Sequence, residues 1–230
     1  MITLESIIKG SELFFGSYSI FYIVVYIILA VSSFNEIKKY YINKYFLHKD
    51  IIIKSNNAIG VSIVAPAFNE GLTIISNVKS LLSQEYPKFE VVIVNDGSTD
   101  DTLEKLISEF ELVKVDFFYI EKIKTEPVRG HYRSTNPIYN KLLIVDKENG
   151  KSKADASNAG INSTRYSLFI CTDVDCILRR DTTAMLVKPF LESDKKVIAA
   201  GAALRISNSC TFKEGMLYKS NYPDGFFFVF

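Results

Sequence analysis

Hydrophobic positions divide the chain into two parts that differ in periodicity. Residues 13–35 form an apolar run without a charged side chain, whereas from residue 61 onward short apolar runs alternate with segments of helical spacing. A charge-free run of this length can cross a hydrocarbon layer of about 30 Å as a helix. The pattern therefore predicts a short N-terminal segment at 1–12, a transmembrane helix at 13–35 and a folded domain at 61–230.

Two other interpretations of the apolar run remain open. A cleaved signal peptide would begin with basic residues, but here Lys9 is balanced by Glu5 and Glu12. The segment 30–32 could nevertheless serve as a cleavage site. A buried core helix would usually have a shorter apolar run. On balance, the run favours a membrane anchor.

Basic and aromatic residues dominate the segment that follows the apolar run. Between residues 36 and 60, lysines outnumber the acidic side chains, and tyrosine and phenylalanine are interleaved with them. Basic residues beside a span favour the cytoplasmic side, and aromatic rings settle at the level of the lipid headgroups. We therefore expect a juxtamembrane linker at 36–60 and a cytoplasmic domain attached to the cell (inner) membrane.

The folded domain is expected to alternate strands with helices. Apolar runs indicate strands at 61–65, 89–94, 113–120, 142–145, 167–172 and 197–204, and helical spacing indicates helices at 72–82, 101–110, 154–162 and 182–191. The interval 121–141 is polar and contains two prolines, which is typical of a surface loop. Such alternation is typical of the α/β class, here a mostly parallel sheet with helices on both faces, preceded by one transmembrane helix.

Composition narrows the classes of function. Lysine and arginine total 27 against 26 aspartates and glutamates, a formal net charge of +1. A nucleic-acid-binding protein usually has a strongly basic face, so we expect no nucleic-acid partner. The three cysteines, Cys171, Cys176 and Cys210, and the two histidines match no zinc-binding spacing. The cysteines are interpreted as reduced thiols of a cytosolic domain.

Polar clusters follow three of the expected strands, at 67–70, 95–98 and 173–175. Ligands of parallel sheets bind beyond the carboxyl ends of the strands. Asp173 and Asp175 are two positions apart in an extended segment, so both carboxylates can face one site. Such a pair selects a hard cation, Mg²⁺ or Mn²⁺, which commonly bridges nucleotide phosphates. The alternative is an ordinary acidic turn, because Asp-x-Asp alone is a weak motif.

Three further polar residues each have a chemical and an ordinary interpretation. Asp96 lies in an Asp-Gly-Ser turn, which is also common turn and cap chemistry. Lys153 begins an expected helix, where it could neutralise a diphosphate or simply be solvated. Glu70 could simply be a first-turn acid that stabilises the dipole of the next helix.

The order of four motifs resembles a known family. The motifs are SIVAPAFNE, VVIVNDGSTDDT, KENG followed by KADASNAGI, and CTDVD. Over residues 61–207 the chain resembles the family 2 glycosyltransferases with the GT-A fold. Within that family it is similar to the membrane-bound branch that includes hyaluronan, poly-N-acetylglucosamine and cellulose synthases.

The resemblance implies a site for a nucleotide sugar. The residues that it places there are Ala65, Pro66, Ala67, Glu70, Asp96, Lys153, Asp155 and Asp173. Among them, Asp96 would contact the uracil or its ribose, and Lys153 and Asp155 would lie near the diphosphate and the donor sugar. Asp173 would also approach the metal, Mg²⁺ or Mn²⁺, which Asp175 holds and which stabilises the departing UDP as a Lewis acid.

Two departures from the family pattern affect these expectations. The segment 150–154 is one residue longer than the family's usual Asn-Gly-Gly-Lys-Ala, so either Lys151 or Lys153 could face the phosphates. The Gln-x-x-Arg-Trp motif of processive members is absent because the chain has no tryptophan. The family's catalytic base, an aspartate in a later acidic motif, is expected beyond Phe230. The resemblance therefore implies a domain truncated near the phenylalanine-rich segment 223–230.

The expected function is that of the donor-binding half of a hexosyltransferase-type glycosyltransferase. Its parent enzyme would use a UDP-sugar and a divalent metal and transfer the sugar with inversion to a growing polysaccharide, whereas this chain alone would be inactive in transfer. Two alternatives stay open: a transferase with a lipid-phosphate acceptor, and a noncatalytic truncated protein that binds a nucleotide sugar. The expected partners are the UDP-sugar, a polysaccharide or lipid-linked acceptor, and the membrane.

Overall fold

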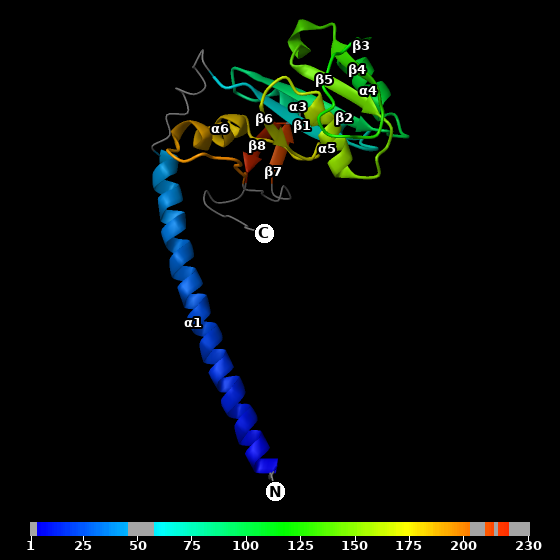
Figure 1. Cartoon of the computed structure of the whole chain (residues 1–230). Helices are drawn as coiled ribbons and strands as arrows, with labels where there is room; N and C mark the ends of the chain where they lie inside the picture. Colours follow the sequence, from blue (N-terminus) through cyan, green and yellow to red (C-terminus); the bar gives the residue numbers. More distant parts are fainter. Residues whose placement is uncertain (1–3, 46–57, 203–209, 214–215, 221–230) are drawn as a thin grey trace. The chain divides into compact units, whose positions relative to one another are not determined.

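A computed structural model describes residues 4–45, 58–202, 210–213 and 216–220 of the chain (Figure 1). The chain divides into two compact units, Met1–His48 and Lys49–Phe230. Several sequence predictions lie partly outside the described residues, namely 1–3 of the expected N-terminal segment, 46–57 of the expected linker, 203–204 of an expected strand, and 203–209, 214–215 and 221–230 of the expected domain. The phenylalanine-rich segment 223–230 lies wholly outside them.

The first unit contains one long helix, α1, which spans Leu4–Tyr45. Its stretch Ile8–Lys38 is long and apolar enough to cross a membrane, and its most apolar window is not buried by the rest of the structure. Aromatic rings four residues apart lie near one another along α1. The ring centroids of Tyr18 and Tyr22 are 5.6 Å apart, and those of Tyr22 and Tyr26 are 5.1 Å apart. The expected apolar helix is therefore present and extends beyond both ends of the apolar run.

A six-stranded sheet forms the centre of the second unit, in the order β3-β4-β5-β2-β1-β6. Four neighbouring strands run parallel: β1 (Val61–Ala67), β2 (Phe89–Asp96), β5 (Leu142–Lys147) and β6 (Leu168–Cys171). Two more strands extend the sheet beyond β5: β4 (Val128–Ser134), antiparallel to β5, and β3 (Leu112–Val115), antiparallel to β4. The mostly parallel sheet that the sequence predicts is confirmed.

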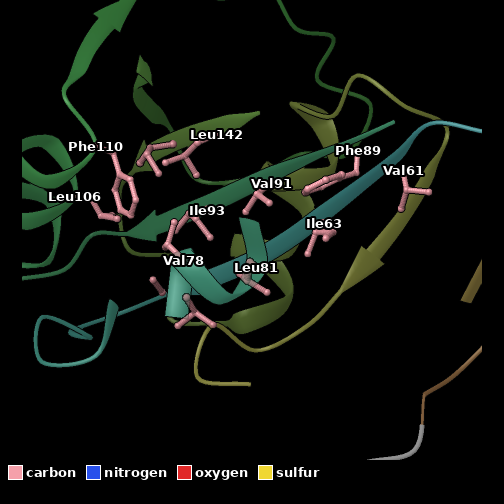
Figure 2. Close-up of a cluster of buried hydrophobic side chains, with 14 of the residues drawn as sticks. Val61, Ile63, Val78, Leu81, Phe89, Val91, Ile93, Leu106, Phe110 and Leu142 are labelled. Carbon is pink, nitrogen blue, oxygen red and sulfur yellow. The ribbon is translucent and has the colours of Figure 1, made fainter. Parts of the chain in front are cut away.

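Helices cover both faces of this sheet, because alternate residues of its apolar strands point to opposite sides. The first face packs against α3 (Ile74–Leu82), α4 (Thr102–Glu109) and α6 (Thr182–Glu192), and the second packs against α5 (Lys153–Asn162). Figure 2 shows the first core, where Val78 and Leu81 of α3 and Leu106 of α4 cluster with Ile63 and Ile93 of the strands. The second core consists of Val64, Val92, Val94, Leu143, Val145, Ala156 and Ala159.

Gly160 lets α5 lie close against the sheet. A Cβ atom at this position would lie 2.4 Å from Cγ1 of Val64 and 2.8 Å from Cγ2 of Val94. Both distances are shorter than van der Waals contact, so any side chain at Gly160 would push the helix and the strands apart. Asp155, a predicted site residue, belongs to the first turn of α5. The close packing of α5 on the sheet therefore also fixes the position of Asp155.

The interval 121–141 is not a surface loop throughout, because β4 occupies its centre. The sequence of β4 is mostly polar and lacks the hydrophobic pattern of a buried strand. Its order comes instead from backbone hydrogen bonds to β3 on one side and β5 on the other. Pro127 and Pro137 flank the strand and do not interrupt it, which fits the inability of proline to donate to a ladder. The neighbouring strand, expected at 113–120, ends already at Val115.

The strand expected at 197–204 is wrong over its described part, since residues 197–202 form neither a strand nor a helix. This run consists largely of alanine and glycine, whose small side chains contribute little buried surface to a sheet. A two-stranded antiparallel sheet that the sequence did not indicate follows it, formed by β7 (Cys210–Lys213) and β8 (Met216–Ser220).

Candidate functional site

Polar side chains gather at the carboxyl edge of the parallel strands. The register pairs Ala67 of β1 with Asn95 of β2, and it pairs Asp96 with Lys147 of β5. The turn after β6 carries Asp173 at the same edge of the sheet. The three polar clusters that the sequence predicts therefore follow the ends of neighbouring strands.

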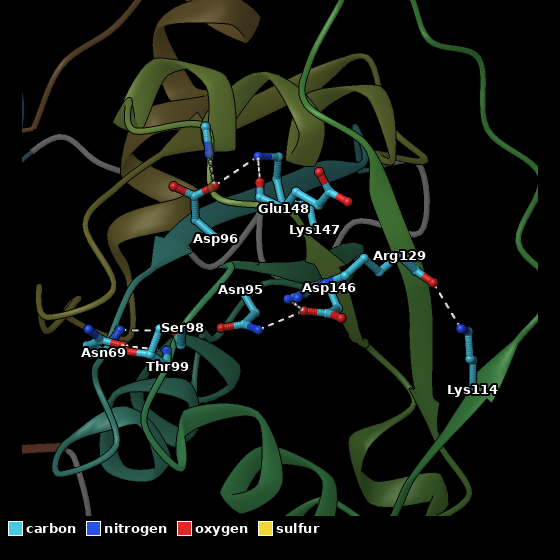
Figure 3. A network of polar contacts seen from close by, with 11 residues as sticks. Asn69, Asn95, Asp96, Ser98, Thr99, Lys114, Arg129, Asp146, Lys147 and Glu148 are labelled. Carbon is cyan, nitrogen blue, oxygen red and sulfur yellow. Dashed lines mark hydrogen bonds and ion pairs between the residues drawn. The ribbon is translucent and has the colours of Figure 1, made fainter.

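Lys147 is a buried lysine held by two carboxylates. Its Nζ atom lies 2.9 Å from Oδ1 of Asp96, a contact drawn in Figure 3. The same atom lies 2.7 Å from Oδ2 of Asp155, and the side chain has 0% exposure. It also donates to the carbonyl oxygen of Glu148. Burial by itself lowers the pKa of this ammonium, but the hydrogen bonds and charges of Asp155 and Asp96 more than offset burial, so the pKa stands above its ordinary value.

A tight turn closes over Asp96. The backbone N–H of Gly150 donates to Oδ1 of Asp96 at 3.1 Å, the same oxygen that accepts from Lys147. Gly97 has a φ of 65°, and a Cβ atom there would lie 2.7 Å from the backbone nitrogen of Asn149. Only glycine fits both the left-handed backbone and this close approach. No described residue donates to the other oxygen of Asp96, Oδ2, and the side chain keeps 10% exposure.

The loops after β1 and β2 lock into one another. Oδ1 of Asn69 accepts a hydrogen bond of 2.8 Å from the N–H of Thr99, and the N–H of Asn69 donates to Oγ of Ser98 at 3.0 Å (Figure 3). The N–H of Glu70 donates to Oγ1 of Thr102, while its carboxylate accepts from Oγ1 of Thr73 just before α3. The carboxylate of Glu70 therefore lies where the ordinary interpretation, an acid at a helix start, places it.

The acidic pair after β6 lies on the surface beside a thiol. Ligand atoms of Asp173, Asp175 and Cys176 all lie within 4.8 Å of one another. Val174 between the two aspartates is only 3% exposed and packs into the core. The segment is a turn, closed by a hydrogen bond of 3.1 Å from the N–H of Cys176 to the carbonyl oxygen of Asp173, and not the extended segment that the sequence suggested. Val174 anchors this turn, and the two carboxylates still lie close enough to share a cation. Two carboxylates suit Mg²⁺ or Mn²⁺, and the sequence did not single out Cys176 as a neighbour of the pair.

Lys153 connects this acidic pair with the start of α5. Its Nζ atom forms an ion pair with Oδ1 of Asp173, and both side chains are about half exposed or more, 62% and 48%. Lys151, the alternative lysine, has a φ of 52° and its N–H donates to Oδ1 of Asn149. The structure thus brings Lys153, but not Lys151, into contact with a predicted site residue.

The remaining predicted residues belong to β1. Ala65 and Ala67 are 0% and 2% exposed, so their methyl groups belong to the core and only their main chain could line a pocket. Pro66, between them, is partly exposed. The residue that sequence reasoning missed is Lys147. One indication of its burial was available from the sequence: Lys147 comes two residues after Val145, so its side chain is on the same face of β5 as Val145.

Comparisons with known proteins find similarity over part of the chain. Residues 62–122 match the model of the family described as Glycosyl transferase family 2. The chain is 28% identical over 165 residues to the poly-beta-1,6-N-acetyl-D-glucosamine synthase of Staphylococcus aureus (strain COL). The aligned region covers 72% of this chain and 33% of the synthase. It is 27% identical over 158 residues to the synthase of the same name from Staphylococcus epidermidis. That alignment covers 68% of this chain and 32% of the synthase. The chain thus spans about a third of the length of these curated relatives.

Two solved structures overlap with the chain at lower similarity. One is the mannosyltransferase PcManGT from Pyrobaculum calidifontis in complex with GDP-Man and Mn²⁺, which is 24% identical to this chain. The superposed region covers 72% of this chain and 43% of the PcManGT chain, with a TM-score of 0.44. The other is Staphylococcus aureus TarS 1-349 in complex with UDP-GlcNAc, which is 18% identical to this chain. The superposed region covers 66% of this chain and 39% of the TarS chain, with a TM-score of 0.43.

Proposed function

The chain carries a glycosyl transferase family 2 domain, and from this premise we propose that its second unit binds a UDP-sugar together with Mg²⁺ or Mn²⁺. One observation carries the proposal. Acidic side chains from β2, from the first turn of α5 and from the turn after β6 gather at the carboxyl edge of the parallel strands. This edge is where ligands of parallel α/β sheets bind.

We assign the nucleoside to the end of β2. Oδ2 of Asp96 is an acceptor without a described donor, and it suits the N3–H of uracil or a hydroxyl of the ribose. The main chain of residues 65–67 would line the base, with Glu70 behind it. Asp155 is close to the start of α5, where the helix dipole favours the negative charge of a diphosphate.

We assign the diphosphate and the metal to the turn after β6. Asp175 and Asp173 would hold the cation, which when bound supplies Lewis-acid stabilisation to the departing UDP. Lys153 is exposed and already contacts Asp173, so it can neutralise a phosphate without being drawn out of the core. Lys151 has no such contact among the described residues, and we therefore prefer Lys153 for this role.

The acceptor and the cellular setting are part of the same proposal. The similarity to two poly-beta-1,6-N-acetyl-D-glucosamine synthases supports transfer of a hexose, with inversion, to a growing polysaccharide by the whole enzyme. We place the domain at 61–230, behind a transmembrane helix at 13–35 and a linker at 36–60. The apolar helix α1 supports a membrane anchor, and the lysines that follow its apolar run 13–35 favour a cytoplasmic domain.

The test is calorimetric titration of the full chain in detergent with UDP, in the presence and absence of Mn²⁺. Asp175→Asn removes a charged ligand at nearly constant volume, so UDP affinity with Mn²⁺ is expected to fall about tenfold or more. Asp194→Asn, an exposed acid after α6, is the matched control and should leave the affinity unchanged. Equal UDP affinity in Asp175→Asn and the parent would contradict the assignment.

A further inference from the structure

We propose that Lys147 is a positioning residue of the donor site, which holds the Asp96 carboxylate in the one orientation that leaves an oxygen for the nucleoside. The inference rests on the proposed function, because it assigns a task to the site already described. Lys147 has 0% exposure, so its ammonium cannot contact a ligand itself. Its effect on binding must pass through the side chains that it touches.

The sheet register creates the contact between Lys147 and Asp96. The two residues are paired across β2 and β5 and point to the α5 face, in phase with Val94 and Val145. An ammonium on that face would lie among apolar side chains, and burying an unpaired charge is very costly. Asp96 supplies one counter-charge from the neighbouring strand, and Asp155 supplies the other from above the sheet. The lysine is tolerated there because both carboxylates are present.

The two carboxylate oxygens of Asp96 differ in their contacts, and this difference suits the binding of a nucleoside. Oδ1 accepts from Nζ of Lys147 at 2.9 Å and from the N–H of Gly150 at 3.1 Å, so rotation of the carboxylate would break two hydrogen bonds. Oδ2 has no donor among the described residues. A carboxylate fixed at one oxygen and open at the other presents a single acceptor in a defined direction, which lowers the entropy cost of binding a donor group.

The same ammonium joins the two ends of the proposed ligand site. Asp155, its second partner, accepts at Oδ1 from the N–H of Glu126, and Oδ2 would lie 2.2 Å from a Cβ atom at Gly150. Lys153 is on the same helical turn as Asp155 and contacts Asp173. Lys147 therefore connects the residue assigned to the nucleoside with the helix start assigned to the diphosphate. Its raised pKa keeps it charged at neutral pH, so it acts by electrostatic positioning and not by moving a proton.

A double-mutant cycle separates positioning from general stability. The variants are Lys147→Met, Asp96→Asn and the two combined, each titrated with UDP in the presence of Mn²⁺ as the full chain in detergent. If Lys147 acts through Asp96, Lys147→Met lowers UDP affinity about tenfold in the parent and less than about twofold in the Asp96→Asn background. Equal losses in both backgrounds would overturn the proposal, because an effect of Lys147 that does not pass through the Asp96 carboxylate is the same whether or not that carboxylate is present.

Two further variants keep the test decisive. Removal of Lys147 leaves two carboxylates without their counter-charge, so Lys147→Met can unfold the domain. In that case Lys147→Arg, which keeps the charge but changes the geometry of the contact, replaces it in the same cycle. Its loss of affinity, expected at about threefold, must also vanish in the Asp96→Asn background. Lys188→Met removes a lysine of α6 that is 17% exposed and ion-paired with Glu192, and it should leave UDP affinity unchanged.

The outcome distinguishes this inference from the proposed function. If the parent chain does not bind UDP with Mn²⁺ at all, the proposed function fails and the inference fails with it. If the parent binds UDP but the effects of Lys147 and Asp96 simply add, only the positioning role fails.

Discussion

Single residues set the charge balance at the carboxyl edge of the sheet. Asp96 and Asp155 share the positive charge of Lys147, and Lys153 contacts only one member of the acidic pair after β6. Carboxylates therefore outnumber ammonium groups at this edge. A surplus of this kind is relieved by a bound cation, which is the electrostatic reason to expect a divalent metal there.

A residue away from the site gives a pH prediction. His131 is 5% exposed, stacks on Phe117 with a centroid distance of 4.5 Å, and shares a hydrogen bond of 3.0 Å with Oγ of Ser163. Burial first, and the charge of Arg133 second, lower the pKa of His131 to about 4. The unfolded chain takes up this proton near its ordinary pKa of about 6.5, and the folded chain only near 4. The free energy of unfolding should therefore fall as pH drops from about 6.5 to 4, by about 3 kcal/mol from this residue.

His131→Gln keeps a polar partner for Ser163 but cannot titrate. Denaturant unfolding of the full chain in detergent at pH 7, 5.5 and 4 should show a smaller acid-induced loss in the variant than in the parent. Carboxylates that titrate over the same range affect both proteins and cancel in the comparison. Parallel pH profiles for the two proteins would show that His131 is not held neutral by the fold.

Some residues of the proposed site could be picked out from the sequence and others could not, for physical reasons. Asp96 and Asp155 belong to motifs after strands, and the structure joins them in one cluster. Lys147 ends an apolar strand, where a lysine ordinarily extends into solvent. Its burial depends on the register between β2 and β5 and on Asp155 from a separate helix. Such a contact between distant segments cannot be seen in the local pattern of a single sequence.

At the scale of elements, the packing of α5 on the sheet can be tested at Gly160. Gly160→Ala should improve helix propensity by up to about 1 kcal/mol. The added methyl group, however, would overlap Val64 and Val94. Overpacking of a close contact typically costs about 1–3 kcal/mol, so a net loss of stability is expected.

Thermal unfolding followed by circular dichroism measures this change. The matched control is Gly16→Ala in α1, where a Cβ atom would meet nothing within 4 Å. The control should leave the transition of the domain unchanged, while Gly160→Ala should lower its midpoint by several degrees. An unchanged or raised midpoint in Gly160→Ala would mean that α5 can move away from the sheet at little cost.

The elements themselves were predictable where burial decided them. β1, β2 and β5 are apolar on both faces, and their runs were recognised with limits close to the observed ones. β4 was missed because it is ordered by backbone hydrogen bonds to β3 and β5. These backbone contacts leave no hydrophobic pattern in the sequence of β4. The run at 197–202 shows the opposite error, since apolar composition without large side chains did not produce a strand.

For the whole molecule, the apolar run 13–35 within α1 and the lysines that follow this run predict a membrane topology. The full chain should sediment with membranes, and a protease added outside intact spheroplasts should leave the domain after residue 57 undigested. After lysis, the same protease should digest it. Digestion of the domain in intact spheroplasts, or its release into the medium as a shortened protein, would contradict the proposed anchor and orientation.

A structure of the full chain with bound UDP and Mn²⁺ would show whether the carboxyl edge of the parallel strands is the donor site. We expect an anomalous peak for Mn²⁺ at the carboxylate of Asp175, close to Asp173, with the diphosphate beside it. We also expect a hydrogen bond from the uracil or its ribose to Oδ2 of Asp96, with Nζ of Lys147 still bonded to Oδ1. A nucleotide bound elsewhere on the domain, or bound at this edge without contact to Asp96 and Asp175, would contradict this assignment.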